Sequence, residues 1–122
     1  MRVLLSIRPE HAASILEGGK RFEYRRRVFK QEVTSVVLYA SSPTRKLVGE
    51  FQVGEILQDH PENLWLATAD EGGISPEQFF DYFAGCESGY AITVGRITKY
   101  SEPIDPKDVF DGFRAPQSFA YM

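Results

Sequence analysis

Four short runs of apolar or alternating residues constrain the fold of this chain more than any other feature. They occupy residues 3–7, 33–40, 47–53 and 90–97, and glycine, proline or serine interrupts the chain between them. Runs of this length that are rich in branched side chains are typical of β-strands. No run approaches the ~18 apolar residues of a membrane span, and the first run is too short for a signal peptide. We therefore expect a cytoplasmic protein built largely from strands.

Helical patterns separate these strands. Residues 9–18 and 61–69 each begin with a proline, the residue favoured at the first position of a helix. Ser75 and Gln78 form the pattern of a capping box, which predicts a third helix ending at Gly85. Its aromatic residues are expected in the core together with Trp65, and they are Phe79, Phe80 and Phe83. Residues 105–106 and 118–121 predict a short helical turn and a last edge strand.

Few residues of the chain could hold a metal. Cys86 is the only cysteine, which excludes an intramolecular disulfide and a cysteine-based zinc cage. His11 and His60 are the only histidines, and neither has a recognisable partner in the sequence. We expect neither a metal nor a cofactor.

Charge is strongly segregated along the sequence. Residues 1–46 carry a net charge of +6, residues 47–95 carry −9, and residues 96–122 are neutral. Six of the basic residues lie between Lys20 and Lys30. This pattern favours a positive face for an anionic ligand and an acidic surface, residues 47–95, that could contact a partner protein. The alternative is an ordinary solvated surface on which the charges interleave in three dimensions.

The segment from Gly18 to Arg25 is the candidate for chemistry. Its alternation predicts a strand on which Glu23 and Arg25, two residues apart, project from the same face. With Lys20 at the rim, this face offers a carboxylate acceptor and cationic donors to a base edge and a phosphate. The alternative is an exposed ion pair that contributes at most about 1 kcal/mol to stability.

The same segment resembles the G-x-K-x-x-E-x-R signature of ASCH domains, which are members of the PUA-like superfamily. The resemblance extends over the whole chain, to a compact, stand-alone branch described only as predicted regulators. The other similar segments are Ser6-Ile7-Arg8-Pro9, Tyr39-Ala40-Ser41-Ser42-Pro43, Val48-Gly49-Glu50-Phe51 and Ala115-Pro116-Gln117-Ser118-Phe119. The resemblance implies one domain over residues 1–122 with an α+β fold. That fold is a small PUA-like β-barrel of about five or six mostly antiparallel strands with three to four short flanking helices.

The resemblance also implies a cleft that binds RNA or a modified nucleoside, and our leading hypothesis is single-stranded RNA or a nucleotide from it. The candidate ligand-binding residues are Arg8, Lys20, Glu23, Arg25, Arg26, Arg27, Ser41, Ser42, Arg114, Gln117 and Ser118. Arg26, Arg27 and Lys30 would hold the phosphate backbone.

Whether the protein is an enzyme stays open at this point. Some ASCH proteins are amidohydrolases of acetylated cytidine, and others cleave RNA. Lys20 and Glu23 are the catalytic candidates, although Glu23 stands where the amidohydrolases carry threonine. A buried Lys20 close to a second carboxylate would favour an enzyme, whereas an exposed Lys20 on a broad basic face would favour a binding protein.

Overall fold

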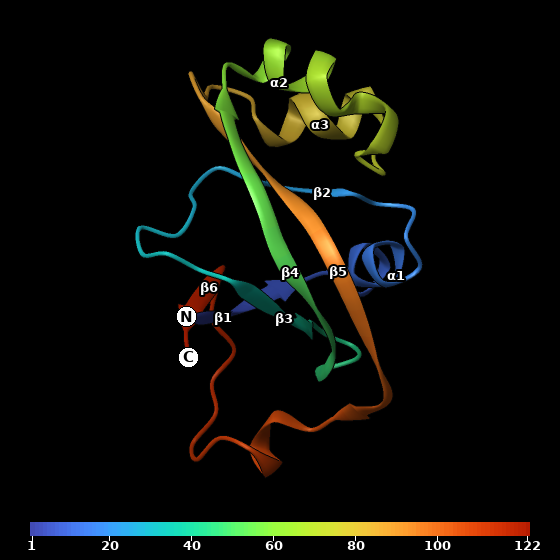
Figure 1. Cartoon of the computed structure of the whole chain (residues 1–122), viewed down its shortest axis with the longest axis vertical. Coiled ribbons are helices and arrows are strands. Elements are labelled where there is room, and N and C mark those ends of the chain that lie inside the picture. The colour runs from blue at the N-terminus through green and yellow to red at the C-terminus, as the bar shows by residue number, and fades with distance from the viewer.

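A curled six-stranded sheet with helices packed against it forms the architecture of the protein (Figure 1). The computed structural model describes all 122 residues. The strands are β1 (Arg2–Ile7), β2 (Phe22–Arg25), β3 (Ser35–Ala40), β4 (Lys46–Asp59), β5 (Gly89–Ile104) and β6 (Phe119–Tyr121). The helices are α1 (Pro9–Leu16), α2 (Pro61–Thr68) and α3 (Pro76–Tyr82), with 3-10 turns η1 (Ala69–Glu71) and η2 (Pro106–Asp108). None of these helices is long and apolar enough to cross a bilayer.

The strand order is β2-β5-β4-β3-β1-β6, and every pair is antiparallel except β1 with β3. This confirms the α+β class and the mostly antiparallel sheet. The barrel remains partly open, because β2 and β6 are the two edges and do not pair. The segment after β2 reaches across to β6 instead: Phe29 packs on Phe119, and the Lys30 amide donates to the Tyr121 hydroxyl.

The strands β4 and β5 are much longer than the runs that predicted them. They contain 14 and 16 residues and form a long antiparallel ribbon. The pairing register shifts between Val53 and Ile56, around Gly54, and the strand then continues. Sequence reasoning stopped too early because the second half of β4 is largely exposed and therefore lacks an apolar pattern.

The sheet and the helices enclose separate apolar clusters. The larger one lies against α1 and contains residues of β1, β3 and β5, and a second lies where α2 and α3 cover the other end of the sheet. Phe79 and Phe83 are buried in the second cluster, with Trp65 packed beside them. Phe80 is 39% exposed, so its predicted place in the core is wrong. It extends from the outer side of α3 and touches only Trp65 and Phe79 among the aromatic rings.

The predicted capping box at the start of α3 is confirmed. The Ser75 hydroxyl accepts from the Gln78 amide at 3.1 Å, and Gln78 Oε1 accepts from the Ser75 amide at 3.0 Å. Ser75→Ala removes the first of these bonds, and we expect it to lower the free energy of unfolding by about 1 kcal/mol. Urea denaturation measures this loss. Ser101→Ala, which removes an exposed hydroxyl that makes no hydrogen bond, is the control, and an equal effect in both variants would contradict the prediction.

Candidate functional site

Residues from β1, α1, β2 and α3 line a pocket of about 540 Å³ at one edge of the sheet. This volume lies in the range of ordinary small-molecule sites. The lining residues are Ser6, Ile7, Arg8, His11, Lys20, Glu23, Tyr24, Arg25, Ile74, Gln78, Asp81 and Tyr82. Segments that are more than 70 residues apart in the sequence therefore meet in one site.

Glu23 is held between two cations at the base of this pocket. Its Oε2 accepts from Arg25 Nε at 2.9 Å and pairs with Nη2 at 2.7 Å, and its Oε1 lies 3.7 Å from Lys20 Nζ. Glu23 and Lys20 are only 6% and 2% exposed. Oε2 is therefore engaged by the Arg25 guanidinium, whereas Oε1 makes only an ion pair with Lys20. A buried charge of this kind requires such partners.

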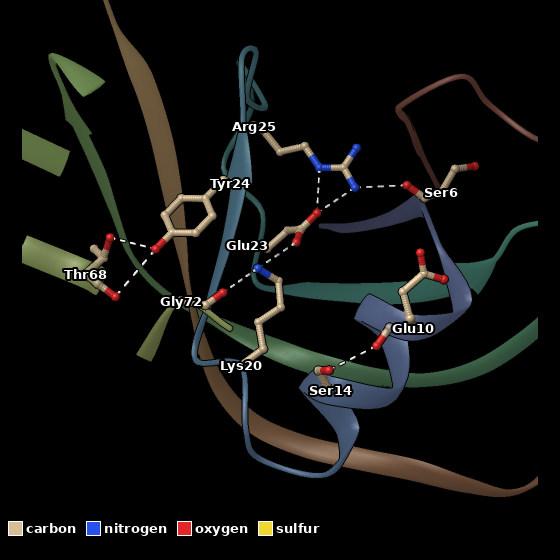
Figure 2. A network of polar contacts seen from close by, with 9 residues as sticks. All are labelled: Ser6, Glu10, Ser14, Lys20, Glu23, Tyr24, Arg25, Thr68 and Gly72. Atoms are coloured by element: carbon tan, nitrogen blue, oxygen red, sulfur yellow. Dashed lines mark hydrogen bonds and ion pairs between the residues drawn. The ribbon is translucent and has the colours of Figure 1, made fainter. Parts of the chain in front are cut away.

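Lys20 is fixed from several sides. Its ammonium donates to the Gly72 carbonyl at 2.8 Å and lies 4.8 Å from the centre of the Tyr24 ring. Burial lowers the pKa of Lys20, and the neighbouring Glu23 opposes that shift. Figure 2 shows the resulting chain of contacts, which runs from Gly72 through Lys20, Glu23 and Arg25 to Ser6.

Arg25 connects the edge strand β2 to the other side of the curled sheet. Its Nη2 donates to the Ser6 carbonyl at 2.9 Å, and its Nη1 lies 3.4 Å from the Ser118 hydroxyl. The Ser6 hydroxyl in turn donates to the Pro116 carbonyl at 2.7 Å. A guanidinium has five N–H donors, and these contacts leave one on Nη1 for a ligand. The Arg25 side chain thus bridges the open side of the barrel, where the edge strands do not pair.

Two further titratable groups line the pocket. Partial burial lowers the pKa of His11, and the charge of Lys20 adds to the shift, so the imidazole is neutral at pH 7. Burial raises the pKa of Tyr24, whose hydroxyl lies 2.7 Å from that of Thr68 in α2. Tyr24 therefore connects the pocket to the helical layer.

Comparison with models of protein families identifies the family of this chain. The model of the ASCH domain matches residues 5–105. The chain belongs to the ASCH domain family. The resemblance seen in the Gly18–Arg25 segment and its neighbouring motifs is thereby confirmed, and so is the PUA-like fold that it implied.

Related proteins support this assignment. An "ASCH domain-containing ribonuclease" from Zymomonas mobilis is 29% identical over 98% of this chain and 82% of its own length. The crystal structure of ASCH from Zymomonas mobilis has a TM-score of 0.92 with 28% identity, covering 99% of this chain and 87% of that one. The N-terminal domain of Staphylothermus marinus McrB, with a TM-score of 0.55 and 14% identity, covers 92% of this chain and 80% of its own, and shares the fold alone.

The ASCH signature residues and several other candidates meet in this pocket. Arg8, Lys20, Glu23 and Arg25 line it, and Ser118 contacts Arg25 at its edge. Gln117 and Arg114 are exposed residues of the same C-terminal segment, and neither lines the pocket. Arg8 is exposed at the rim, and its side chain makes no hydrogen bond or ion pair, so it is the free cation of the site.

Other candidates lie outside the pocket. Ser41 and Ser42 belong to the turn after β3, where the Ser41 carbonyl accepts from the Thr44 amide, and neither lines the pocket. Arg26 donates from Nε to the Tyr82 carbonyl at 2.8 Å. Arg27 is exposed just beyond it.

The acidic and basic parts of the sequence interleave in three dimensions. Asp81 lines the same pocket as Arg8, and Glu50 forms a 2.9 Å ion pair with Arg2. The predicted separation into a positive face and an acidic face is therefore incomplete. One wall of the pocket comes from the acidic stretch itself.

Sequence reasoning missed that wall. We call four lining residues the α3 wall: Gln78, Asp81 and Tyr82 from α3, and Ile74, the residue before its N-cap. Three of them follow an i, i+3, i+4 spacing, which places Gln78, Asp81 and Tyr82 on one face of the helix. This spacing was the available signal, but nothing in the sequence indicated that the face would lie opposite Lys20. His11 was likewise assigned no role.

Proposed function

We propose that this ASCH domain binds single-stranded RNA, or a nucleotide or modified base from it, in the pocket. The observation that carries the proposal is the cationic end of the pocket, where Arg8 is unpaired and Arg25 retains one free donor. The planar guanidinium group donates paired hydrogen bonds that match the geometry of a phosphate. The Zymomonas mobilis relative named as a ribonuclease supports RNA as the source of that phosphate.

Each residue of the cationic end has a distinct task in this proposal. Arg8 and Arg25 contact the phosphate. Lys20 and Glu23 hold the Arg25 guanidinium in place before the ligand arrives, which reduces the entropy lost on binding. Glu23 also neutralises one of the two cations beside it. The net positive charge that remains attracts an anion to the pocket.

A single strand fits this site better than a duplex. A pocket of about 540 Å³ admits one nucleotide whose base has left the stack. The backbone of the neighbouring nucleotides would follow the exposed basic residues after β2, which are Arg26, Arg27 and Lys30. Such contacts position a strand without reading its sequence. The lone Cys86 fits the reducing cytoplasm in which we place this activity.

Arg8→Ala tests the proposal. Because the Arg8 side chain makes no hydrogen bond or ion pair within the protein, its loss is expected to weaken binding of a fluorescently labelled decamer RNA without unfolding the domain. The slope of log affinity against log salt should fall by about 0.7, the value for one single-strand phosphate contact. Fluorescence anisotropy at several salt concentrations measures both quantities.

Arg96→Ala is the matched control for this experiment. Arg96 is an exposed arginine of β5 that neither lines the pocket nor forms an ion pair. Equal loss of affinity in the two variants would mean that RNA is attracted by overall charge and does not occupy the pocket.

RNA cleavage is a second candidate function, favoured by the name of the Zymomonas mobilis relative. The burial of Lys20 is the first of the two features that would favour an enzyme, the other being a second carboxylate close to it. His11 offers a neutral imidazole that could accept a proton. The amidohydrolase alternative fits less well, because Glu23 is 6% exposed and its charge is balanced by Lys20 and Arg25. Incubation with end-labelled RNA, and separately with acetylated cytidine, decides whether either is turned over.

A further inference from the structure

The pocket has two chemically different ends. Arg8, Lys20 and Arg25 form the cationic end, whereas the α3 wall contributes an aliphatic, an amide, a carboxylate and an aromatic side chain. A nucleotide has the same two-part character, with an anionic phosphate and a planar base that carries donors and acceptors. The carboxylate of Asp81 repels a phosphate. This repulsion fixes the direction in which a nucleotide enters, with the phosphate toward Arg8 and the base toward α3.

Gln78 presents a hydrogen-bond donor to that base. Its Oε1 accepts from the Ser75 backbone amide at 3.0 Å as part of the capping box, which holds the oxygen toward the start of the helix. The capping box therefore also fixes which side of the amide is free. Nε2, a donor with two N–H groups, is left for the pocket.

Asp81 presents a hydrogen-bond acceptor to the base. Its carboxylate lines the pocket, is exposed there, and makes no hydrogen bond or ion pair within the protein. An ionised carboxylate only accepts hydrogen bonds. The other carboxylate that lines the pocket, Glu23, is 6% exposed, and its charge is balanced by Lys20 and Arg25. Asp81 is thus the free carboxylate of the site.

Tyr82 completes the wall with a fixed aromatic ring. Its hydroxyl accepts from the Arg26 amide at 3.2 Å, and the Arg26 guanidinium lies 4.4 Å from the ring centre. These contacts, together with the bond from Arg26 Nε to the Tyr82 carbonyl, tie β2 to α3. The ring and Ile74 supply the apolar surface that an unstacked base needs.

We infer that the α3 wall reads the base, and that it selects bases carrying an exocyclic amino group over uracil. This inference rests on the proposed RNA-binding function and assigns the base specificity of the same site. Asp81 accepts from the amino group, while Gln78 Nε2 donates to the adjacent ring nitrogen or carbonyl. Carboxylates pair with the amino group of cytosine in the same manner in nucleic-acid complexes.

Uracil fits this wall poorly for an electrostatic reason. Its single edge N–H lies between two carbonyl oxygens, and a carboxylate that approaches the N–H meets their lone pairs. An amino group projects from the ring edge and presents two hydrogens. Cytosine and adenine place an acceptor next to it, in reach of a donor such as Gln78 Nε2.

Asp81→Asn tests the inference, with labelled decamers of cytidine, adenosine and uridine as probes at one salt concentration. The wild-type protein is expected to bind the cytidine and adenosine decamers about tenfold more tightly than the uridine decamer. In Asp81→Asn this ratio should fall to about one, because the new amide can also donate to the uracil carbonyl.

Glu77→Gln provides the matched control on the same helix. It removes the same charge from an exposed residue of α3 that does not line the pocket, so it should raise all three affinities slightly and leave the ratio unchanged. The inference is overturned if Asp81→Asn changes all three affinities by one common factor, as Glu77→Gln does. It is also overturned if the wild type does not discriminate among the decamers.

The two levels of the proposal fail in different ways. If all three decamers bind equally, and Arg8→Ala weakens this binding whereas Arg96→Ala does not, the RNA-binding function is retained. Only the base selectivity is then rejected. Absence of binding to any decamer would reject both.

Discussion

Lys20→Met is expected to lower the free energy of unfolding by about 3 kcal/mol, since removal of one member of a buried ion pair leaves the other uncompensated. Lys20 is 2% exposed and contacts both Glu23 and the Gly72 carbonyl. Arg25 still pairs with Glu23 in the variant, so we expect the lower end of the range for such pairs. For a domain stabilised by about 5–15 kcal/mol this loss is large.

Urea denaturation followed by circular dichroism measures the loss, with Lys30→Met as the control. Lys30 is exposed, and only its backbone amide is bonded. A double-mutant cycle with Glu23→Gln isolates the interaction, and we expect a coupling energy of about 1–3 kcal/mol. Equal stability of the Lys20→Met and Lys30→Met proteins would show that Glu23 does not need its second cation.

The difference in stability between the wild type and Lys20→Met is expected to depend on pH with a definite sign. Burial lowers the pKa of Lys20 below its ordinary value of 10.5. Between the lowered pKa and 10.5 the unfolded chain binds more protons at this residue than the folded one, so the free energy of unfolding rises with pH. The stability of the wild type relative to Lys20→Met should therefore increase as the pH approaches 10.5.

The buried position of Lys20 also changes which substitutions are informative about function. Lys20→Arg preserves charge and removes the ability to exchange a proton near neutrality, which would separate a binding protein from an enzyme at an exposed site. Here the Lys20 side chain is enclosed by Gly72, Glu23 and Tyr24. The larger guanidinium would have to displace these neighbours, so loss of activity would also report the strain of overpacking. Arg8 and Asp81 are the better positions because their side chains are exposed.

Local sequence patterns predicted much of this fold. The features that they did not predict depend on packing between segments far apart in the sequence. The α3 capping box and the short strands follow from residues that are near neighbours in sequence. The parallel pairing of β1 with β3 and the lengths of β4 and β5 depend on partners elsewhere in the chain. Alternation correctly placed Glu23 and Arg25 together, because a strand's period fixes which face each residue occupies.

Alternation gives the face of a strand but not the depth at which that face lies. Lys20 was therefore expected at a rim, whereas the segment from Gly72 to Ile74 covers it and α3 completes the pocket. About 50 residues separate Lys20 from that cover in sequence. Two sequence-level hypotheses, the basic face and the acidic partner surface, could not anticipate that residues of both regions would share one pocket.

Gly72→Ala is expected to destabilise the fold by about 3 kcal/mol, the upper end for insertion of a methyl group into a packed site. A Cβ at this position would overlap the Tyr24 hydroxyl and lie 2.9 Å from its Cζ. Tyr24 is buried and fixed by its contact with Thr68, so neither side can move cheaply. Gly19→Ala is the control, because the nearest atom to its added methyl group is 3.8 Å away.

A second substitution separates this steric cause from a loss of helix or turn propensity. Tyr24→Phe removes the hydroxyl that the Gly72→Ala methyl group overlaps, and it also removes the contact with Thr68. If the overlap is the cause, the double variant should lose about 1 kcal/mol less free energy of unfolding than the two single variants lose in sum. Strictly additive losses would mean instead that the methyl group acts through the backbone and not through the Tyr24 hydroxyl.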